Sequence, residues 1–111
     1  MATNYIQPGD VLTLPAPYDV ASGAGMRVGS IFAVALAAAS NGANVQAQRA
    51  GVWTLPKLTS DDVTAGAKLY WDNTNKRLTL TSSGNTLVGA ATAAAGTSAT
   101  TVSVMLDGAV R

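Results

Sequence analysis

Hydrophobic and polar residues alternate over several short segments of the chain, with the two-residue period of a β-strand. In the segment 44–49, Val45 and Ala47 fall on one side of an extended chain, and Gln46 and Gln48 fall on the other. Glycines and prolines recur at short intervals between such segments. This punctuation is typical of an all-β domain built from short strands.

We therefore predict a succession of short strands joined by turns. The predicted strands cover residues 10–14, 26–28, 31–39, 44–49, 52–55, 68–72, 77–81, 86–92 and 101–106. The apolar run 31–39 is also compatible with a short helix, but its length and its glycine boundary favour a strand. One helical turn is predicted after Ser60, whose side chain would cap it while Asp61 and Asp62 lie at its positive end.

The segment 68–81, KLYWDNTNKRLTLT, has the clearest pattern in the chain. It predicts a β-hairpin in which Leu69, Trp71, Leu78 and Leu80 point into the core. The four-residue loop between its strands is a common hairpin length. Aspartate and asparagine side chains in such a loop can bond their own backbone, so the polar cluster is explained without a ligand.

These elements predict a small single-domain all-β fold, either a β-sandwich or a β-barrel. The domain would span residues 10–111 and follow an extended N-terminal arm of residues 1–9. Composition also argues against helix, because glutamate is absent and threonine, valine and glycine are abundant.

A faint internal repeat adds to this interpretation. Residues 20–26 resemble residues 63–69, and residues 37–51 match residues 93–108 more loosely. The second half carries extra residues where the predicted hairpin lies, as if a hairpin were inserted into one half of a duplicated β-unit. Alanine-rich sequences also match by chance, so the pattern leaves true duplication open.

Charge is scarce in this chain. Only 12% of residues are charged, against about 25% in a typical domain, and the net charge is +1. Such a surface is a solubility risk for a monomer, so we expect much of it to be buried against further copies or another protein. A surface of Thr, Ser, Asn and Gly is the alternative. No apolar run approaches the ~20 residues of a membrane-spanning helix, and the polar start shows no signal pattern.

The residues of catalysis and metal binding are few. The chain has no histidine and no cysteine, which removes the commonest general base and the thiolate ligands. A calcium loop starting at Asp72 fails because Arg77 stands where glycine is required. The phosphate-loop motif is absent, and Tyr70 with its mixed-charge neighbours makes a weak platform for nucleic acid. We therefore predict a protein that is not an enzyme and that has no cofactor and no metal.

Segments spread over nearly the whole chain resemble a family of small tailed-phage proteins, the capsid cement or decoration proteins. The matching segments are 4–10 (NYIQPGD), 20–23, 28–29, 51–57 (GVWTLPK), 65–72 (AGAKLYWD), 75–76, 84–89 and 102–106. No single segment is specific, but their order and spacing together are. The chain departs from the family pattern at Ala33, where members often have glycine, and in having fewer acidic residues.

This resemblance implies a bacteriophage virion protein that binds the outer surface of the assembled capsid and stabilises the shell by protein–protein contacts. The implied partners are the major capsid protein and further copies of the chain, with a trimer favoured over a dimer; neither a membrane nor direct nucleic-acid contact is expected. The protein would be made in the bacterial host cytoplasm. Some related sequences carry a RecA-like recombinase label, so an accessory protein that binds single-stranded nucleic acid is the alternative.

The resemblance and the polar, extended start of the chain together make the N-terminal arm the predicted partner-binding segment. Its residues are Thr3, Asn4, Tyr5, Ile6, Gln7 and Pro8. Tyr5 and Ile6 would anchor the arm, and an extended arm of this kind can add a strand to the edge of a neighbour's sheet.

Overall fold

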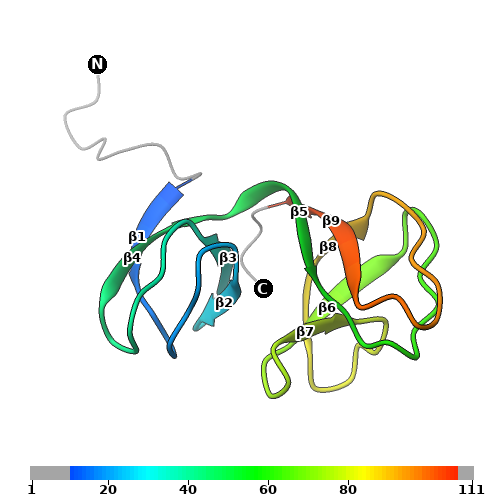
Figure 1. Ribbon diagram of the computed structural model, residues 1–111, viewed down its shortest axis with the longest axis horizontal. Coiled ribbons are helices and arrows are strands. Elements are labelled where there is room, and N and C mark those ends of the chain that lie inside the picture. Colours follow the sequence, from blue (N-terminus) through cyan, green and yellow to red (C-terminus); the bar gives the residue numbers. More distant parts are fainter. Residues whose placement is uncertain (1–10, 108–111) are drawn as a thin grey trace.

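The computed structural model describes residues 11–107, and within that range the chain forms nine strands in two antiparallel sheets (Figure 1). The strand order is β1-β4-β3-β2 in the first sheet and β5-β9-β8-β6-β7 in the second. The predicted all-β fold of short strands is therefore confirmed. The predicted arm, residues 1–9, lies outside the described residues.

The first sheet contains β1 (Val11–Pro15), β2 (Gly25–Val28), β3 (Ile31–Ala35) and β4 (Asn44–Gln48). The second sheet contains β5 (Ala50–Pro56), β6 (Lys68–Asp72), β7 (Arg77–Thr79), β8 (Thr86–Ala91) and β9 (Thr101–Asp107). A single residue, Arg49, separates β4 from β5, so the chain passes directly from one sheet to the other.

Most predicted strands are present, with two corrections. The apolar run 31–39 is a strand only up to Ala35. The helical turn predicted after Ser60 was wrong, because the backbone there makes a turn closed by a 3.1 Å bond from Asp61 N to Leu58 O. The carboxylate of Asp61 does not serve a helix end; it accepts hydrogen bonds from the Thr79 hydroxyl at 2.8 Å and the Leu80 amide at 2.9 Å.

The two sheets are built on one plan. The first sheet, β1-β4-β3-β2, corresponds strand by strand to β5-β9-β8-β6 of the second. The pairing register agrees as well. Leu14 pairs with Val45 in the first sheet, and in the second Leu55 pairs with Val102. We call residues 11–48 the first unit and residues 50–107 the second unit.

Hydrogen bonds outside the sheets repeat in the same way. Gly23 N donates to Ala35 O at 2.7 Å in the first unit, and Gly66 N donates to Ala91 O at 2.8 Å in the second. Gly23 and Gly66 share a φ of 85°, a left-handed value that glycine adopts without strain. The fold therefore contains the same β-unit twice, and β7 with its hairpin loop is the addition that distinguishes the second copy.

Each unit buries the same face of its sheet. The core of the first unit gathers Ala16, Val20, Met26, Ala33, Ala35, Val45 and Ala47. The core of the second gathers Leu55, Val63, Leu69, Trp71, Leu78, Val88, Ala91, Val102, Val104 and Leu106, and it also includes Phe32 and Val34 of the first unit. The second core has larger side chains, and it extends across the boundary between the units.

Aromatic packing joins the two units. The ring centroids of Phe32 and Trp71 lie 4.9 Å apart, with their planes inclined at 51°. The edge of the Trp71 indole occupies the space above Gly25, where a Cβ atom would lie only 2.9 Å from Trp71 Cη2. Val34, the cross-strand partner of Gly25, is fully buried in the same contact region. The face of the first sheet that points away from its own core is thus covered by the second unit.

Candidate interaction surfaces

The hairpin forms with its first strand and its loop as predicted, whereas its second strand, predicted over residues 77–81, ends at Thr79. Trp71 pairs with Leu78 and Asp72 with Arg77, on either side of a loop of residues 73–76. Leu69, Trp71 and Leu78 are buried in the core, as predicted. The prediction for Leu80 was wrong, because this side chain is 37% exposed. The strand ends at Thr79, and the next amide bonds to a loop carboxylate in place of a partner strand.

The aspartate and asparagine side chains of this hairpin stabilise its loop through hydrogen bonds within the loop. Asp72 Oδ1 accepts hydrogen bonds from the Thr74 and Asn75 amides at 3.0 and 3.2 Å, and Oδ2 accepts one from Asn75 Nδ2 at 2.8 Å. These bonds, the Asn75 side chain first, hold the pKa of Asp72 below its ordinary value. The left-handed residue that closes the loop is Lys76, with φ of 57°. The cluster therefore acts as a turn.

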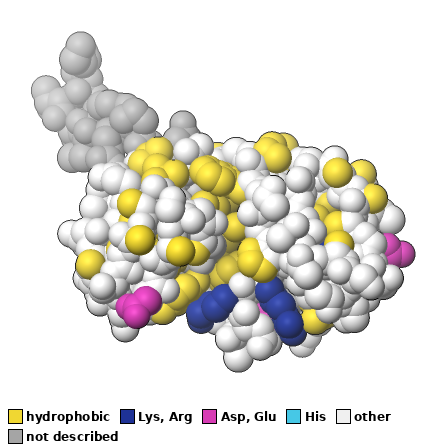
Figure 2. Space-filling view, viewed as in Figure 1, with side chains coloured by type: hydrophobic (Ala, Val, Ile, Leu, Met, Phe, Trp, Pro, Cys, Tyr) yellow, Lys and Arg dark blue, Asp and Glu magenta, His cyan; other side chains and the backbone are white. Residues whose placement is uncertain are grey.

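Basic side chains lie at the boundary between the two units. Figure 2 shows Lys and Arg side chains on either side of the boundary between the two lobes. Lys76 Nζ sits 4.3 Å from the centre of the Tyr18 ring, and Arg27 donates to the Thr86 hydroxyl at 3.1 Å. Both contacts cross the boundary. Cation–π pairs of this kind contribute about 0.5–1 kcal/mol when exposed, so these charges help to hold the units together.

Tyr18 is part of the same boundary. Its hydroxyl donates a hydrogen bond to the carbonyl oxygen of Gly25, and its partial burial raises the pKa of the phenol above its ordinary value. The phenol therefore stays a hydrogen-bond donor over the whole neutral range. Tyr18, Gly25 and Trp71 thus form a continuous contact from a first-unit loop to the second-unit hairpin.

The outward face of the second sheet carries the two most exposed large hydrophobic side chains of the described residues. Val52 is 61% exposed and Met105 is 49% exposed, and the two are cross-strand partners. Continuing across the sheet, Met105 pairs with Ala90, and Ala90 pairs with Lys68. An apolar row therefore crosses β5, β9 and β8 and ends at a lysine on β6.

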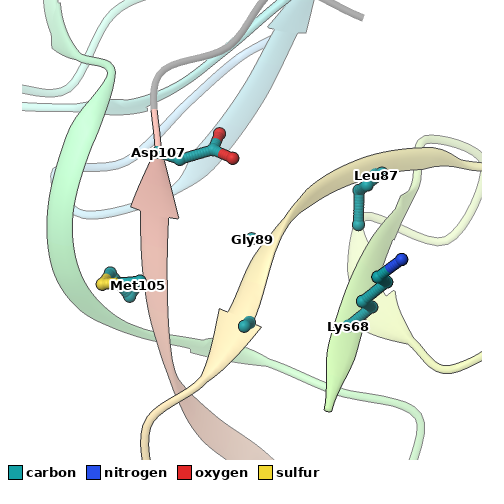
Figure 3. Close-up of a pocket in the computed structure, with 6 residues that line it drawn as sticks. Lys68, Leu87, Gly89, Met105 and Asp107 are labelled. Atoms are coloured by element: carbon teal, nitrogen blue, oxygen red, sulfur yellow. The ribbon is translucent and has the colours of Figure 1, made fainter. Parts of the chain in front are cut away.

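A hollow lies along this row, and we call it the outer groove. Its lining residues are Lys68, Leu87, Gly89, Ala90, Met105 and Asp107. In Figure 3, Met105 and Asp107 stand along β9 on one side of the groove, Gly89 lies in the middle on β8, and Lys68 and Leu87 lie on the other side. The groove thus has an apolar floor with one basic and one acidic residue on opposite sides.

Glycine at position 89 makes this floor possible. A Cβ atom there would lie 2.0 Å from the carbonyl oxygen of Met105, closer than any real side chain comes to backbone. Gly89 lies opposite Leu69, next to the bulge between Leu69 and Tyr70, where the pairing of β6 with β8 shifts. This groove could not be predicted from the sequence, because it depends on which strands lie side by side.

Neither a metal-ligand cluster nor a membrane-spanning helix occurs among the described residues. Within residues 11–107, no group of three or more His, Cys, Asp or Glu lies close enough together to hold a metal ion. The same part of the chain contains no helix long and apolar enough to cross a membrane. The buried Lys57 caps a turn, since its Nζ donates to Leu58 O at 2.9 Å and Asp61 O at 2.7 Å.

The predicted partner-binding residues Thr3, Asn4, Tyr5, Ile6, Gln7 and Pro8 lie outside the described residues. The nearest described element is β1, which is an edge strand with β4 as its neighbour in the sheet. The role of the arm therefore stays a prediction.

Comparison with known proteins gives one match. A family model described as phage cement protein matches residues 6–106, which is most of the chain. No curated protein and no solved structure matches the sequence or the fold.

Proposed function

We propose that this chain, which belongs to the phage cement protein family, binds the outer surface of an assembled capsid and stabilises the shell through contacts with the major capsid protein. The family match over residues 6–106 is the observation that carries this proposal. Membership of this family implies a location in the virion capsid.

Surface chemistry supports a role in protein–protein contact. Cores of protein interfaces are depleted of charge and enriched in apolar side chains, and only 12% of this chain is charged. Val52 and Met105 stand exposed on a flat sheet face. A stable interface usually buries about 800 Å² on each partner. A small protein that touches several capsid subunits and its own copies would divide this buried area among several weaker contacts.

The N-terminal arm is the proposed anchor to the capsid. Residues 3–8 are polar apart from Tyr5, Ile6 and Pro8, and they precede the edge strand β1 in the chain. An arm of this kind can pair with the edge of a capsid subunit's sheet, where main-chain hydrogen bonds supply affinity and the two large side chains supply specificity. We further propose that the protein works without catalysis, as a homo-oligomer bound to the outside of the shell.

The alternative of single-stranded nucleic-acid binding has less support. Base stacking needs exposed aromatic rings beside a basic groove. Trp71 is 1% exposed and packs on Phe32, and Lys76 lies over Tyr18. Trp71 and Lys76 are therefore engaged within the fold, and of the aromatic pair on β6 only the half-buried Tyr70 is left for stacking.

Co-sedimentation tests this proposal. Capsids purified without the protein should carry it into the pellet after mixing, up to a fixed number of copies per shell. A parallel salt titration with single-stranded DNA serves as the comparison, because phosphate binding weakens steeply with salt. Salt-sensitive DNA binding at micromolar protein, together with no saturable binding to capsids, would overturn the proposal.

A further inference from the structure

We infer that the outer groove of the second unit is the docking site for a second copy of this chain, which enters with its first unit. This inference rests on the homo-oligomer of the proposed function and deepens it, because it assigns the surface and the occupant of the contact between copies, and it is tested without any capsid. It rests on the repeat within the fold.

Four positions on the outward face of the first sheet form one cross-strand row, in the order Val11, Gln48, Val34 and Gly25. The corresponding row of the second sheet is Val52, Met105, Ala90 and Lys68. Residues at the same place in the two rows lie on corresponding strands and pair with corresponding neighbours. The two rows are therefore the same face of the same unit.

Within the chain, the first of these faces is a packing surface. Val34 has no exposed surface, and it belongs to the core cluster that contains Trp71 and Leu69 of the second unit. The Trp71 indole lies against Gly25. The fold thus shows one way in which this face is covered, namely by the end of another β-unit.

The corresponding face of the second unit stays open within the described residues. Met105 and Val52 keep about half or more of their surface exposed, and the outer groove runs beside them. Burying apolar surface of this kind stabilises an association by about 25 cal/mol per Å² before the costs of ordering. A face that packs in one unit and is exposed in its repeat is suited to the same type of partner.

That partner is the first unit of a neighbouring copy. Trp71 is the second-unit residue that covers the first unit. Gly25 and Lys68 occupy matching positions in the two units, and Val28 and Trp71 each follow them by three residues. Val28 is therefore the first-unit counterpart of Trp71. Val28 is half-buried and packs at the margin of the first core. The side-chain sizes at the two contacts are complementary. Within the chain, the large Trp71 side chain lies over Gly25, which has no side chain. Between copies, the smaller Val28 side chain would lie over the long side chain of Lys68.

The predicted contact is head-to-tail. The second unit of one copy meets the first unit of the next, so each copy uses two different surfaces. Contacts of this kind close into rings when the rotation between copies permits. The expected product is a discrete ring whose mass is a whole multiple of the 11.2 kDa chain.

Sedimentation velocity of the purified chain over a wide concentration range tests association. The wild type should form a discrete oligomer, and Met105→Glu should weaken it by about 30-fold or more, the size of an interface hot spot. Leu36→Glu is the matched control, because Leu36 is also an exposed apolar residue, at 39%, and follows β3 at the end opposite Ile31. A wild type that is monomeric throughout, or equal effects of the two variants, would overturn the inference.

Cross-linking tests the identity of the occupant. The chain has no cysteine, so two introduced thiols report on one contact alone. On mild oxidation, a mixture of the Lys68→Cys and Val28→Cys variants should give the mixed disulfide dimer faster than either variant pairs with itself. Preferential pairing of Lys68→Cys with itself would indicate a face-to-face dimer and would contradict docking by the first unit. Circular dichroism of each variant confirms that it is folded.

Discussion

The ring centroids of Phe32 and Trp71 lie 4.9 Å apart, and this contact joins the two units of the fold. Phe32 stands on β3 of the first unit, and Trp71 stands on β6 of the second unit, where it pairs with Leu78 of the added strand β7. The indole that covers the first unit therefore comes from a strand that both units share, and the added strand lies beside it.

Gly25→Ala should loosen the boundary between the units. The added Cβ would lie 2.9 Å from Trp71 Cη2 and 3.0 Å from Phe32 Cζ, so one ring must move. Overpacking of this kind lowers the free energy of unfolding by about 1–3 kcal/mol. Gly96→Ala is the control, because its Cβ meets nothing closer than Asp62 Oδ1 at 3.8 Å. Urea unfolding measures both, and equal stability of the two variants would contradict this packing.

Gly89→Ala should be more damaging than Gly25→Ala. Its Cβ would lie 2.0 Å from the Met105 carbonyl oxygen, and a backbone atom held in a sheet cannot turn aside as a ring can. The loss should reach or exceed the upper end of the roughly 1–3 kcal/mol range for overpacking. Thermal unfolding followed by circular dichroism measures it. A Gly89→Ala variant as stable as the wild type would show that β8 and β9 are farther apart than described.

Asp72 should contribute to stability in a pH-dependent way. Hydrogen bonds from Asn75 and Thr74 favour the charged carboxylate, so the pKa in the folded protein lies below the value of 3.8 for the unfolded chain. Below that value the unfolded state takes up the proton first. The contribution is therefore complete above the unfolded pKa and is lost as the pH falls through the folded pKa.

The difference in unfolding free energy between the wild type and Asp72→Ala measures this contribution. It should be constant near neutral pH and shrink as the pH is lowered below 3.8. Asp62→Ala, a change at an aspartate in a loop, controls for general effects of removing a negative charge. A difference that grows on acidification would show that the carboxylate is not held in its charged form by the turn.

Deletion of residues 1–8 should weaken capsid attachment and leave the fold intact. The described strands begin at Val11, and the two cores that the structure describes between residues 11 and 107 are built from later positions. The truncated protein should therefore unfold at a temperature close to that of the full chain while its capsid occupancy falls. If the truncated protein occupied capsids as fully as the wild type, residues 1–8 would not be needed for attachment to the capsid.

Local patterns predicted the strands and the hairpin because those elements depend on near neighbours. Leu69 and Trp71 alternate with polar residues, and the loop between the strands has a common length with side chains that bond to it. Leu80 continues the same alternation, yet its strand ends one residue earlier. The Leu80 amide donates a hydrogen bond to the Asp61 carboxylate and not to a partner strand. The partner that ended the strand comes from 19 residues away, beyond the reach of a local pattern.

The repeat was visible in sequence only as scattered alanines and glycines. In the structure it becomes specific, because Gly23 and Gly66 share one backbone conformation and equivalent hydrogen bonds. The outer groove was not predictable, since Met105 and Lys68 are brought to one face by strand pairings between distant segments. Candidate surfaces of this kind depend on sheet order, and sheet order depends on long-range contacts.

The stability of the capsid itself is the most direct measure of the central claim. Shells assembled without this protein are heated or exposed to mild denaturant, with and without added protein, and DNA release is followed by the fluorescence of a DNA-binding dye. The account predicts that release shifts to a higher temperature as binding saturates, and that the truncated protein lacking residues 1–8 gives a smaller shift. Capsids that release their DNA at the same temperature with the protein bound would contradict a cement function.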